Sequence, residues 1–205
     1  MKKLFTAALV LALAVSMCLT AGAAGFVSSP TNNPAPELDN PPSGVVVTPY
    51  AEREDLPEED RQDLEDAYKE ILDSTDLSEL NEALKDVAEK LDIPVGNIAA
   101  SDLFDLTYVG EGAARITLKN DTLEYFVGLM VYEDGKWALV DDARVENGRL
   151  VFTTAISGPY AVLVDAGKYT KPPKTGDDNS LALYACIMVA SALAFVVVNK
   201  KAKQA

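Results

Sequence analysis

The sequence contains no histidine and only two cysteines, Cys18 and Cys186. Without histidine the chain lacks the commonest general base and a common metal ligand. Both cysteines lie in apolar runs near the ends of the sequence, so no disulfide can form within the polar body between them. Serine–histidine and cysteine–histidine catalysis are therefore excluded for that body, which packing alone has to stabilise.

Several catalytic and cofactor signatures are also absent from the sequence. There is no nucleophile elbow, phosphate loop, dinucleotide fingerprint, zinc-ligand spacing or calcium loop. Paired carboxylates of the kind that glycosidases use remain, and the candidates are Asp102 with Asp105 and Asp141 with Asp142. Because acids are abundant, such pairs are expected by chance. The sequence favours a protein without catalytic activity, cofactor or metal.

The charge of the chain is strongly negative. It carries 32 acidic and 18 basic residues, a formal net charge of −14. If both terminal apolar runs and their flanking charges are removed, five lysines and two aspartates leave with them. Such an acidic body disfavours nucleic acid and anionic membranes as partners. The acidic run 52–66 predicts a solvated helix face and not a metal site.

The N-terminal residues 1–23 have the pattern of a secretory signal peptide. Two lysines precede the apolar run Leu4–Leu19, and small residues follow it. We expect signal peptidase to cleave after Ala23 or, as second choice, after Ala24. Cys18 raises the alternative of a lipoprotein, but Met17 is too large for the position before an acylated cysteine. An apolar signal-peptide core is the favoured interpretation of Cys18.

The C-terminal region contains a second apolar run, Leu181–Val198, which has no charge. Its length is near the lower limit for a helix that crosses a hydrocarbon core of ~30 Å. Three lysines in residues 199–205 predict a cytoplasmic tail, with everything before the run outside. The short polar segment Pro172-Pro173-Lys174-Thr175-Gly176 precedes the run. The pattern alone is compatible with an ordinary single-pass anchor.

The order of motif, apolar run and basic tail resembles the C-terminal sorting signal of Gram-positive surface proteins, the LPXTG family. Pro173, Lys174, Thr175 and Gly176 match in place, whereas Pro172 stands where the family usually has Leu. Pro173 fixes its own φ and biases Pro172 to an extended conformation that suits a binding groove. The resemblance implies that a sortase cysteine attacks the Thr175 carbonyl and releases Gly176 onward. A cell-wall precursor amine then takes the Thr175 acyl group.

The segment between the signal peptide and the first helix is rich in proline. Residues 24–51 therefore predict a disordered or polyproline-like leader that acts as a spacer. Within it, Val45–Val47 is β-prone and is a weak candidate for an edge strand.

Residues 52–93 predict two helices. Pro57 and the acids after it suit a helix start, and Leu64, Tyr68, Ile71 and Leu72 form one apolar stripe. A second helix is expected over Ser78–Leu91, capped by Asp76 or Ser78. Because the connection is short, we expect an antiparallel helical hairpin.

From residue 94 onward the apolar period changes to two, which indicates strands. Asp134-Gly135 and Asn147-Gly148 are suited to type I′ hairpin turns. Short strands at regular spacing predict a small antiparallel β-sandwich over residues 94–166. The candidate strands are Ile98–Ser101, Phe104–Val109, Ala114–Lys119, Tyr125–Glu133, Lys136–Asp141, Arg149–Ala155 and Tyr160–Asp165.

Three stretches of this β region resemble the β domain of small sortase-anchored surface proteins of Clostridia-type bacteria. They are Ser101–Asp105, Asp134–Trp137 and Gly158–Val164. The resemblance implies no activity. Trp137, the only tryptophan, is expected in the core or at its rim, and the alternative is an exposed platform for sugars.

An internal isopeptide bond is a further hypothesis, because some pilin domains contain one. It requires a lysine and an asparagine in contact beside a buried acid. The candidates are Lys119 or Lys136 with Asn120 or Asn147, and the turn positions of both asparagines argue against them.

Together these observations predict an exported α+β protein with a helical hairpin and a β-sandwich. Its parts are a signal peptide (1–23), a leader (24–51), a helical hairpin (52–93), a sandwich (94–166), a linker with the sorting motif (167–180), a membrane segment (181–198) and a tail (199–205). We expect a peptidoglycan-anchored display or adhesion module whose partners are a sortase and a cell-wall precursor. The identity of the ligand that the displayed domain binds, a glycan or a protein, stays open. The alternatives are a membrane-retained structural protein and a small carboxylate-based wall enzyme.

Overall fold

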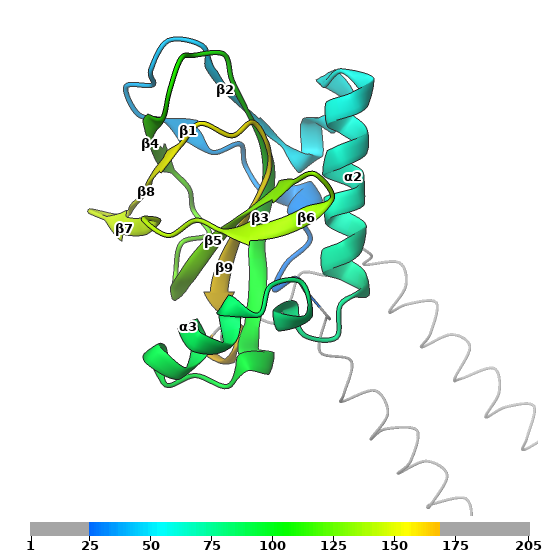
Figure 1. Cartoon of the computed structure of the whole chain (residues 1–205), viewed down its shortest axis with the longest axis vertical. Coiled ribbons are helices and arrows are strands. Elements are labelled where there is room, and N and C mark those ends of the chain that lie inside the picture. Colours follow the sequence, from blue (N-terminus) through cyan, green and yellow to red (C-terminus); the bar gives the residue numbers. More distant parts are fainter. Residues whose placement is uncertain (1–24, 169–205) are drawn as a thin grey trace, which may run out of the picture. The chain divides into compact units, whose positions relative to one another are not determined.

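Two antiparallel sheets form the body of the protein (Figure 1). The computed structural model describes residues 25–168. The larger sheet has the order β2-β3-β9-β5-β6, and the smaller has the order β1-β4-β8-β7. The larger sheet consists of β2 (Val45–Pro49), β3 (Ile98–Tyr108), β9 (Gly158–Asp165), β5 (Phe126–Glu133) and β6 (Lys136–Leu139). The smaller consists of β1 (Glu37–Leu38), β4 (Ala114–Lys119), β8 (Arg149–Thr154) and β7 (Arg144–Glu146).

Strand β3 runs through the middle of this arrangement. It pairs with β2 on one edge and with β9 on the other, and its first nine residues are buried. The sequence predicts two strands over this stretch, but the chain forms one. A register shift between Ala100 and Asp102 lets the strand continue through the polar residues between the two apolar segments.

The two sheets pack face to face over an aromatic core. Phe104 of β3, Phe152 of β8 and Tyr160 of β9 are fully buried. The Tyr160 ring centroid lies 6.0 Å from that of Phe104 and 5.4 Å from that of Phe152. The antiparallel sheets expected from the period of two are thus confirmed.

Helix α2 (Glu58–Asp73) covers the other face of the larger sheet (Figure 1). It begins directly after Pro57, as the sequence predicts. Leu64, Ala67 and Ile71 are fully buried, whereas Leu72 is 47% exposed. The buried stripe therefore includes Ala67, which was not predicted, and excludes Leu72, which was.

The predicted helical hairpin is wrong. Helix α3 (Ala83–Leu91) packs on the 3₁₀ helices η3 (Leu77–Glu79) and η4 (Val95–Asn97), whereas α2 packs on β9 and β3. Asp76 does act as a cap, since its carboxylate accepts from the Ser78 amide at 2.8 Å. It caps the short η3 turn, however, and not a long second helix. This turn directs the chain away from α2 toward the end of the sheet (Figure 1).

The prediction of a disordered leader over 24–51 is also wrong for its described part, residues 25–51. Phe26 bridges to Ala100 of β3 and is only 5% exposed. Further along, β1 joins the smaller sheet and β2 forms an edge of the larger one. The proline-rich composition favours an extended chain, and the sheet edges provide hydrogen-bond partners for it. The weak candidate strand at Val45–Val47 is confirmed within β2.

Both predicted hairpin turns are present. Asp134 and Gly135 have φ values of 51° and 71°, and Asn147 and Gly148 have 52° and 74°. Positive φ at two successive residues is what a type I′ turn requires. These turns fix the registers of β5 with β6 and of β7 with β8.

Substitution of Phe26 tests the ordered N-terminal segment. Phe26→Ala removes a buried ring that lies 5.3 Å from the Tyr68 ring, so we expect the free energy of unfolding to fall by about 3 kcal/mol. Val46→Ala, at a side chain 56% exposed, is the control, and we expect a change below about 0.5 kcal/mol. Chemical denaturation measures both. Equal, small effects would show that residues around Phe26 do not belong to the fold.

Candidate functional sites

The residues predicted to be processed lie outside the described part of the chain. These are Ala23 and Ala24 of the signal-peptidase site, the motif Pro172–Gly176 and the apolar run Leu181–Val198. The described chain ends with the 3₁₀ helix η5 (Ala166–Lys168). Asp165 fastens this turn, since its carboxylate accepts from the Gly167 amide at 3.0 Å and pairs with Lys168 at 3.2 Å.

Asp102 is a buried carboxylate held by three donors. Its Oδ1 accepts from Asn33 Nδ2 at 2.8 Å and from the Leu103 amide at 2.9 Å, and its Oδ2 accepts from Asn120 Nδ2 at 2.6 Å. Burial raises the pKa of Asp102 to about 6, and these hydrogen bonds oppose the rise. The cluster joins the N-terminal segment and the β4–β5 connection to the irregular part of β3.

Asp105 is a second buried carboxylate on β3, with much weaker support. The Thr107 hydroxyl donates a hydrogen bond to its Oδ2 at 3.1 Å. Burial raises the pKa of Asp105 to about 6, and the negative charges of Asp60 and Asp63 on α2 add to the rise. At neutral pH Asp105 is therefore an ionised carboxylate in a buried position that disfavours its negative charge.

The predicted carboxylate pairs do not form catalytic dyads. Asp102 shares a strand face with Phe104 of the core between the sheets, whereas Asp105 shares a face with Leu103, which packs under α2. Their carboxylates therefore point to opposite sides of the larger sheet. In the second pair, hydrogen bonding with the Thr153 side chain and with the Thr153 amide, which donates to Asp142 Oδ1 at 3.0 Å, lowers the pKa of Asp142. That bond gives Asp142 a structural role at the surface.

The isopeptide candidates are not brought together. Asn120 does contact a buried acid, Asp102. Lys119, the neighbouring lysine, instead pairs with Glu37 at 3.2 Å with its side chain 58% exposed. Lys136 and Asn147 are both exposed at hairpin turns. Within residues 25–168 the lysine that the reaction needs is thus absent from the Asp102 cluster.

Trp137 is a core residue, as predicted. Its side chain on β6 is 5% exposed and its ring centroid lies 5.2 Å from that of Tyr132. Its backbone carbonyl accepts from Asn81 Nδ2 at 3.0 Å. Burial of this ring removes the alternative of an exposed platform for sugars.

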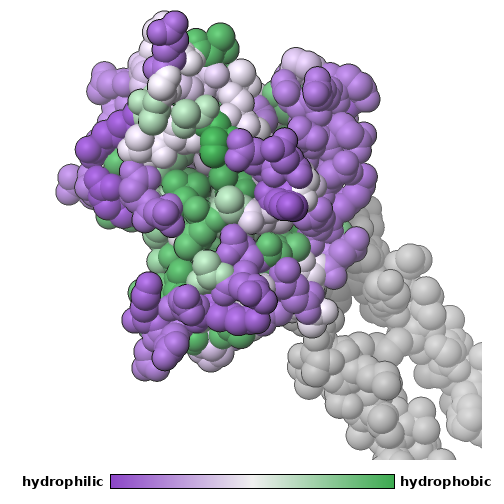
Figure 2. Space-filling model, in the orientation of Figure 1, coloured by the Kyte–Doolittle hydropathy of each residue, from purple (hydrophilic) through white to green (hydrophobic). Residues whose placement is uncertain are grey.

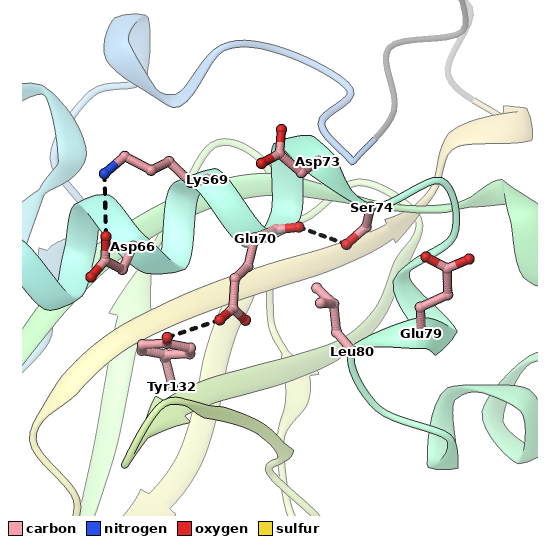
Figure 3. Close-up of a pocket in the computed structure, with 8 residues that line it drawn as sticks. All are labelled: Asp66, Lys69, Glu70, Asp73, Ser74, Glu79, Leu80 and Tyr132. Atoms are coloured by element: carbon pink, nitrogen blue, oxygen red, sulfur yellow. Dashed lines mark hydrogen bonds and ion pairs between the residues drawn. The ribbon is translucent and has the colours of Figure 1, made fainter.

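A shallow polar depression lies between α2 and β5 and has a volume of about 430 Å³ (Figure 3). Glu70 of α2 reaches toward β5, where the Tyr132 hydroxyl donates to its Oε1 at 3.0 Å. Burial and the neighbouring Glu70 raise the pKa of Tyr132 to about 12, so the phenol stays protonated. The lining residues are Asp66, Lys69, Glu70, Asp73, Ser74, Glu79, Leu80 and Tyr132.

The chemistry of this depression is that of an open acidic surface. Four carboxylates line it, and the one lysine pairs with Asp66 at 3.2 Å. Its position was not predicted, because the sequence does not show that Tyr132 of β5 lies beside α2. The acidic run 52–66 does form a solvated helix face, as expected, and hydrophilic side chains cover this side of the molecule in Figure 2.

Residues 25–168 contain no helix long and apolar enough to cross a membrane, and no group of three acidic, cysteine or histidine side chains suited to a metal ion. No protein-family model, curated protein or solved structure matches the chain.

For the two buried aspartates of β3, we expect opposite responses to the same substitution. We expect Asp105→Asn to raise the free energy of unfolding at pH 7 by about 1–2 kcal/mol, part of the ~3 kcal/mol that a pKa rise from 3.8 to about 6 represents. We expect Asp102→Asn to lower the free energy of unfolding by about 1–3 kcal/mol. The new amide NH₂ group would face one of the asparagine NH₂ groups that now donate to the carboxylate, and that hydrogen bond would be lost.

The pH dependence of stability follows from the same pKa values. Between pH 4 and 6 the folded protein binds more protons at Asp102 and Asp105 than the unfolded chain does, so stability decreases as the pH rises through this window. In Asp105→Asn the decrease is expected to be shallower. Urea titrations at intervals from pH 4 to 7 measure both slopes, and equal slopes in the wild type and in Asp105→Asn would contradict the assignment.

Proposed function

We propose that this protein is a cell-wall surface protein, which a sortase attaches to peptidoglycan through the carboxyl group of Thr175. The observation that carries the proposal is the order of Pro172–Gly176, the uncharged run Leu181–Val198 and the lysine-rich residues 199–205. The run halts export and holds the motif outside. The enzyme's thiolate attacks the Thr175 carbonyl, and the amine of Gly176 leaves. A precursor amine then displaces the thiol and forms a new amide with Thr175.

The domain of residues 25–168 is, in this proposal, the part that is displayed. The larger sheet separates Asp102 from Asp105, and Asp142 accepts a hydrogen bond from the Thr153 amide, which favours binding over catalysis as the task of the domain. The acidic depression of Figure 3 is the concave surface on which we expect a polar or cationic group of a ligand to rest. A glycan or a protein supplies that group.

The short tether places the displayed domain near its point of attachment. Asp165 fastens the chain as far as Lys168, and seven residues then lead to Thr175. Fully extended, they span about 25 Å. The ordered segment 25–51 belongs to the domain and provides no outward spacer. We therefore expect the domain to lie within or close to the wall.

Two other functions are distinguishable from this one. A membrane-retained structural protein would keep residues 176–205, including Cys186. A wall enzyme would have to turn over peptidoglycan fragments and lose that activity with Asp-to-Asn substitutions. The separation of Asp102 from Asp105 by the larger sheet argues against the enzyme.

Substitution at the predicted cleavage site tests the proposal. In wall material released by muramidase, we expect a peptide that ends at Thr175 and is joined to a cross-bridge amine. Thr175→Ala should abolish this species and leave the protein in the detergent-soluble membrane fraction. Thr170→Ala, the same change five residues earlier, should leave attachment unaltered. Mass spectrometry of wild-type protein that retains Cys186 and lacks any link to murein would refute wall attachment.

A further inference from the structure

Both ends of the described domain meet at one pole. The Gly25 carbonyl accepts from the Ala100 amide at 2.7 Å, and the Val27 amide donates to the Ala100 carbonyl at 2.9 Å. Two residues earlier on the same strand, Ile98 pairs with Asp165 at the end of β9. The first and last described residues therefore flank the start of β3. We call this end of the domain the anchor pole, formed by residues 25–27, 95–97, 125 and 166–168.

The anchor pole is firmly built. Gly167 packs so closely on η4 that an added Cβ would lie 2.4 Å from Asn97 Nδ2. The Asp165 amide donates to the Tyr125 carbonyl at 3.0 Å, which fixes the residue before β5. Hydrogen bonds and an ion pair thus hold the chain as far as Lys168, and three residues separate Lys168 from the start of the motif at Pro172.

Exposed apolar side chains lie at this pole. Tyr125 is 41% exposed, and Leu91, at the end of the α3 helix that packs on η4, is 49% exposed. The exposed acids Asp92 and Glu124 adjoin them in the sequence. Exposed apolar side chains next to acids suit a partner that offers apolar side chains next to cationic ones.

The short segment between the domain and the motif favours the sortase itself as this partner. Three residues, 169–171, span about 10 Å when fully extended. An enzyme that encloses Pro172–Gly176 in a groove must then bring the surface around that groove against the anchor pole. We propose, on the basis of the sorting function above, that Tyr125 of the anchor pole and Leu91, at the end of the α3 helix that packs on η4, form a second contact with the sortase while it holds the motif.

The test follows the conversion of the full-length precursor into wall-linked protein by pulse-chase labelling in cells. We expect Tyr125→Asn and Leu91→Ser each to slow conversion about two- to tenfold, the range for the loss of one apolar contact. Asparagine is chosen because Tyr125 has a φ of 59°, which asparagine adopts readily. The matched control is Val109→Ser, because Val109 is 79% exposed just beyond the opposite end of β3.

A variant with an inserted spacer distinguishes loss of docking from a folding defect as the cause of slow conversion. With about twelve Gly and Ser residues inserted after Thr170, the enzyme reaches the motif without touching the pole, and the two variants should convert at the rate of the unsubstituted spacer protein. Wild-type conversion rates in both variants with the native tether would overturn the docking proposal. So would equal slowing with and without the spacer. Failure of the sorting function itself would appear differently, as wild-type protein that never becomes wall-linked.

Discussion

The fold depends on the burial of β3 on both faces and its pairing on both edges. One face contributes Phe104 and Leu106 to the core between the sheets, and the other contributes Leu103 to the core under α2. β2 and β9 take its two edges, and the N-terminal segment pairs with its beginning. Because the first nine residues of β3 are buried, each polar group among them needs an internal partner. This requirement explains the contrast between its two aspartates. Asp102 has its donors and helps to position Asn33 and Asn120, whereas Asp105 is opposed by the acids of α2.

Local signals in the sequence predicted the local structures well. The dipeptides at 134–135 and 147–148 encode positive φ directly, so the turns and the hairpins that they close were predictable. The start of α2 followed from Pro57, whose fixed negative φ suits the beginning of a helix. The alternation of apolar residues identified β4, β5, β6, β8 and β9, whereas β1 and β7 were not among the predicted strands and β3 was predicted as two. The favoured core position of Trp137 is confirmed by its burial.

Features that depend on distant parts of the chain were not predictable in this way. Residues 25–51 contain proline and polar residues typical of a spacer, and only the free edges of sheets formed later in the chain give them partners. The helical hairpin did not form because α3 packs on η3 and η4, and its Leu84 and Ala88 enter the same core that α2 and the larger sheet share. The depression at Glu70 and Tyr132 likewise joins residues 62 positions apart. The processing motifs were read from the sequence alone, and they lie outside residues 25–168.

The meeting of both described ends at the start of β3 has a consequence for rearranging the chain order. Gly25 lies beside Ala100 and Asp165 lies beside Ile98, so a short peptide bridge is sufficient to connect the two ends. The exposed glycine-containing loop at 110–112, between β3 and β4, is a suitable place for new termini, because opening it leaves every strand intact. A circularly permuted form of this domain would carry its attachment tail at the far end of β3. The anchor pole, which now lies next to the attachment tail, would then lie at the opposite end of β3 from that tail.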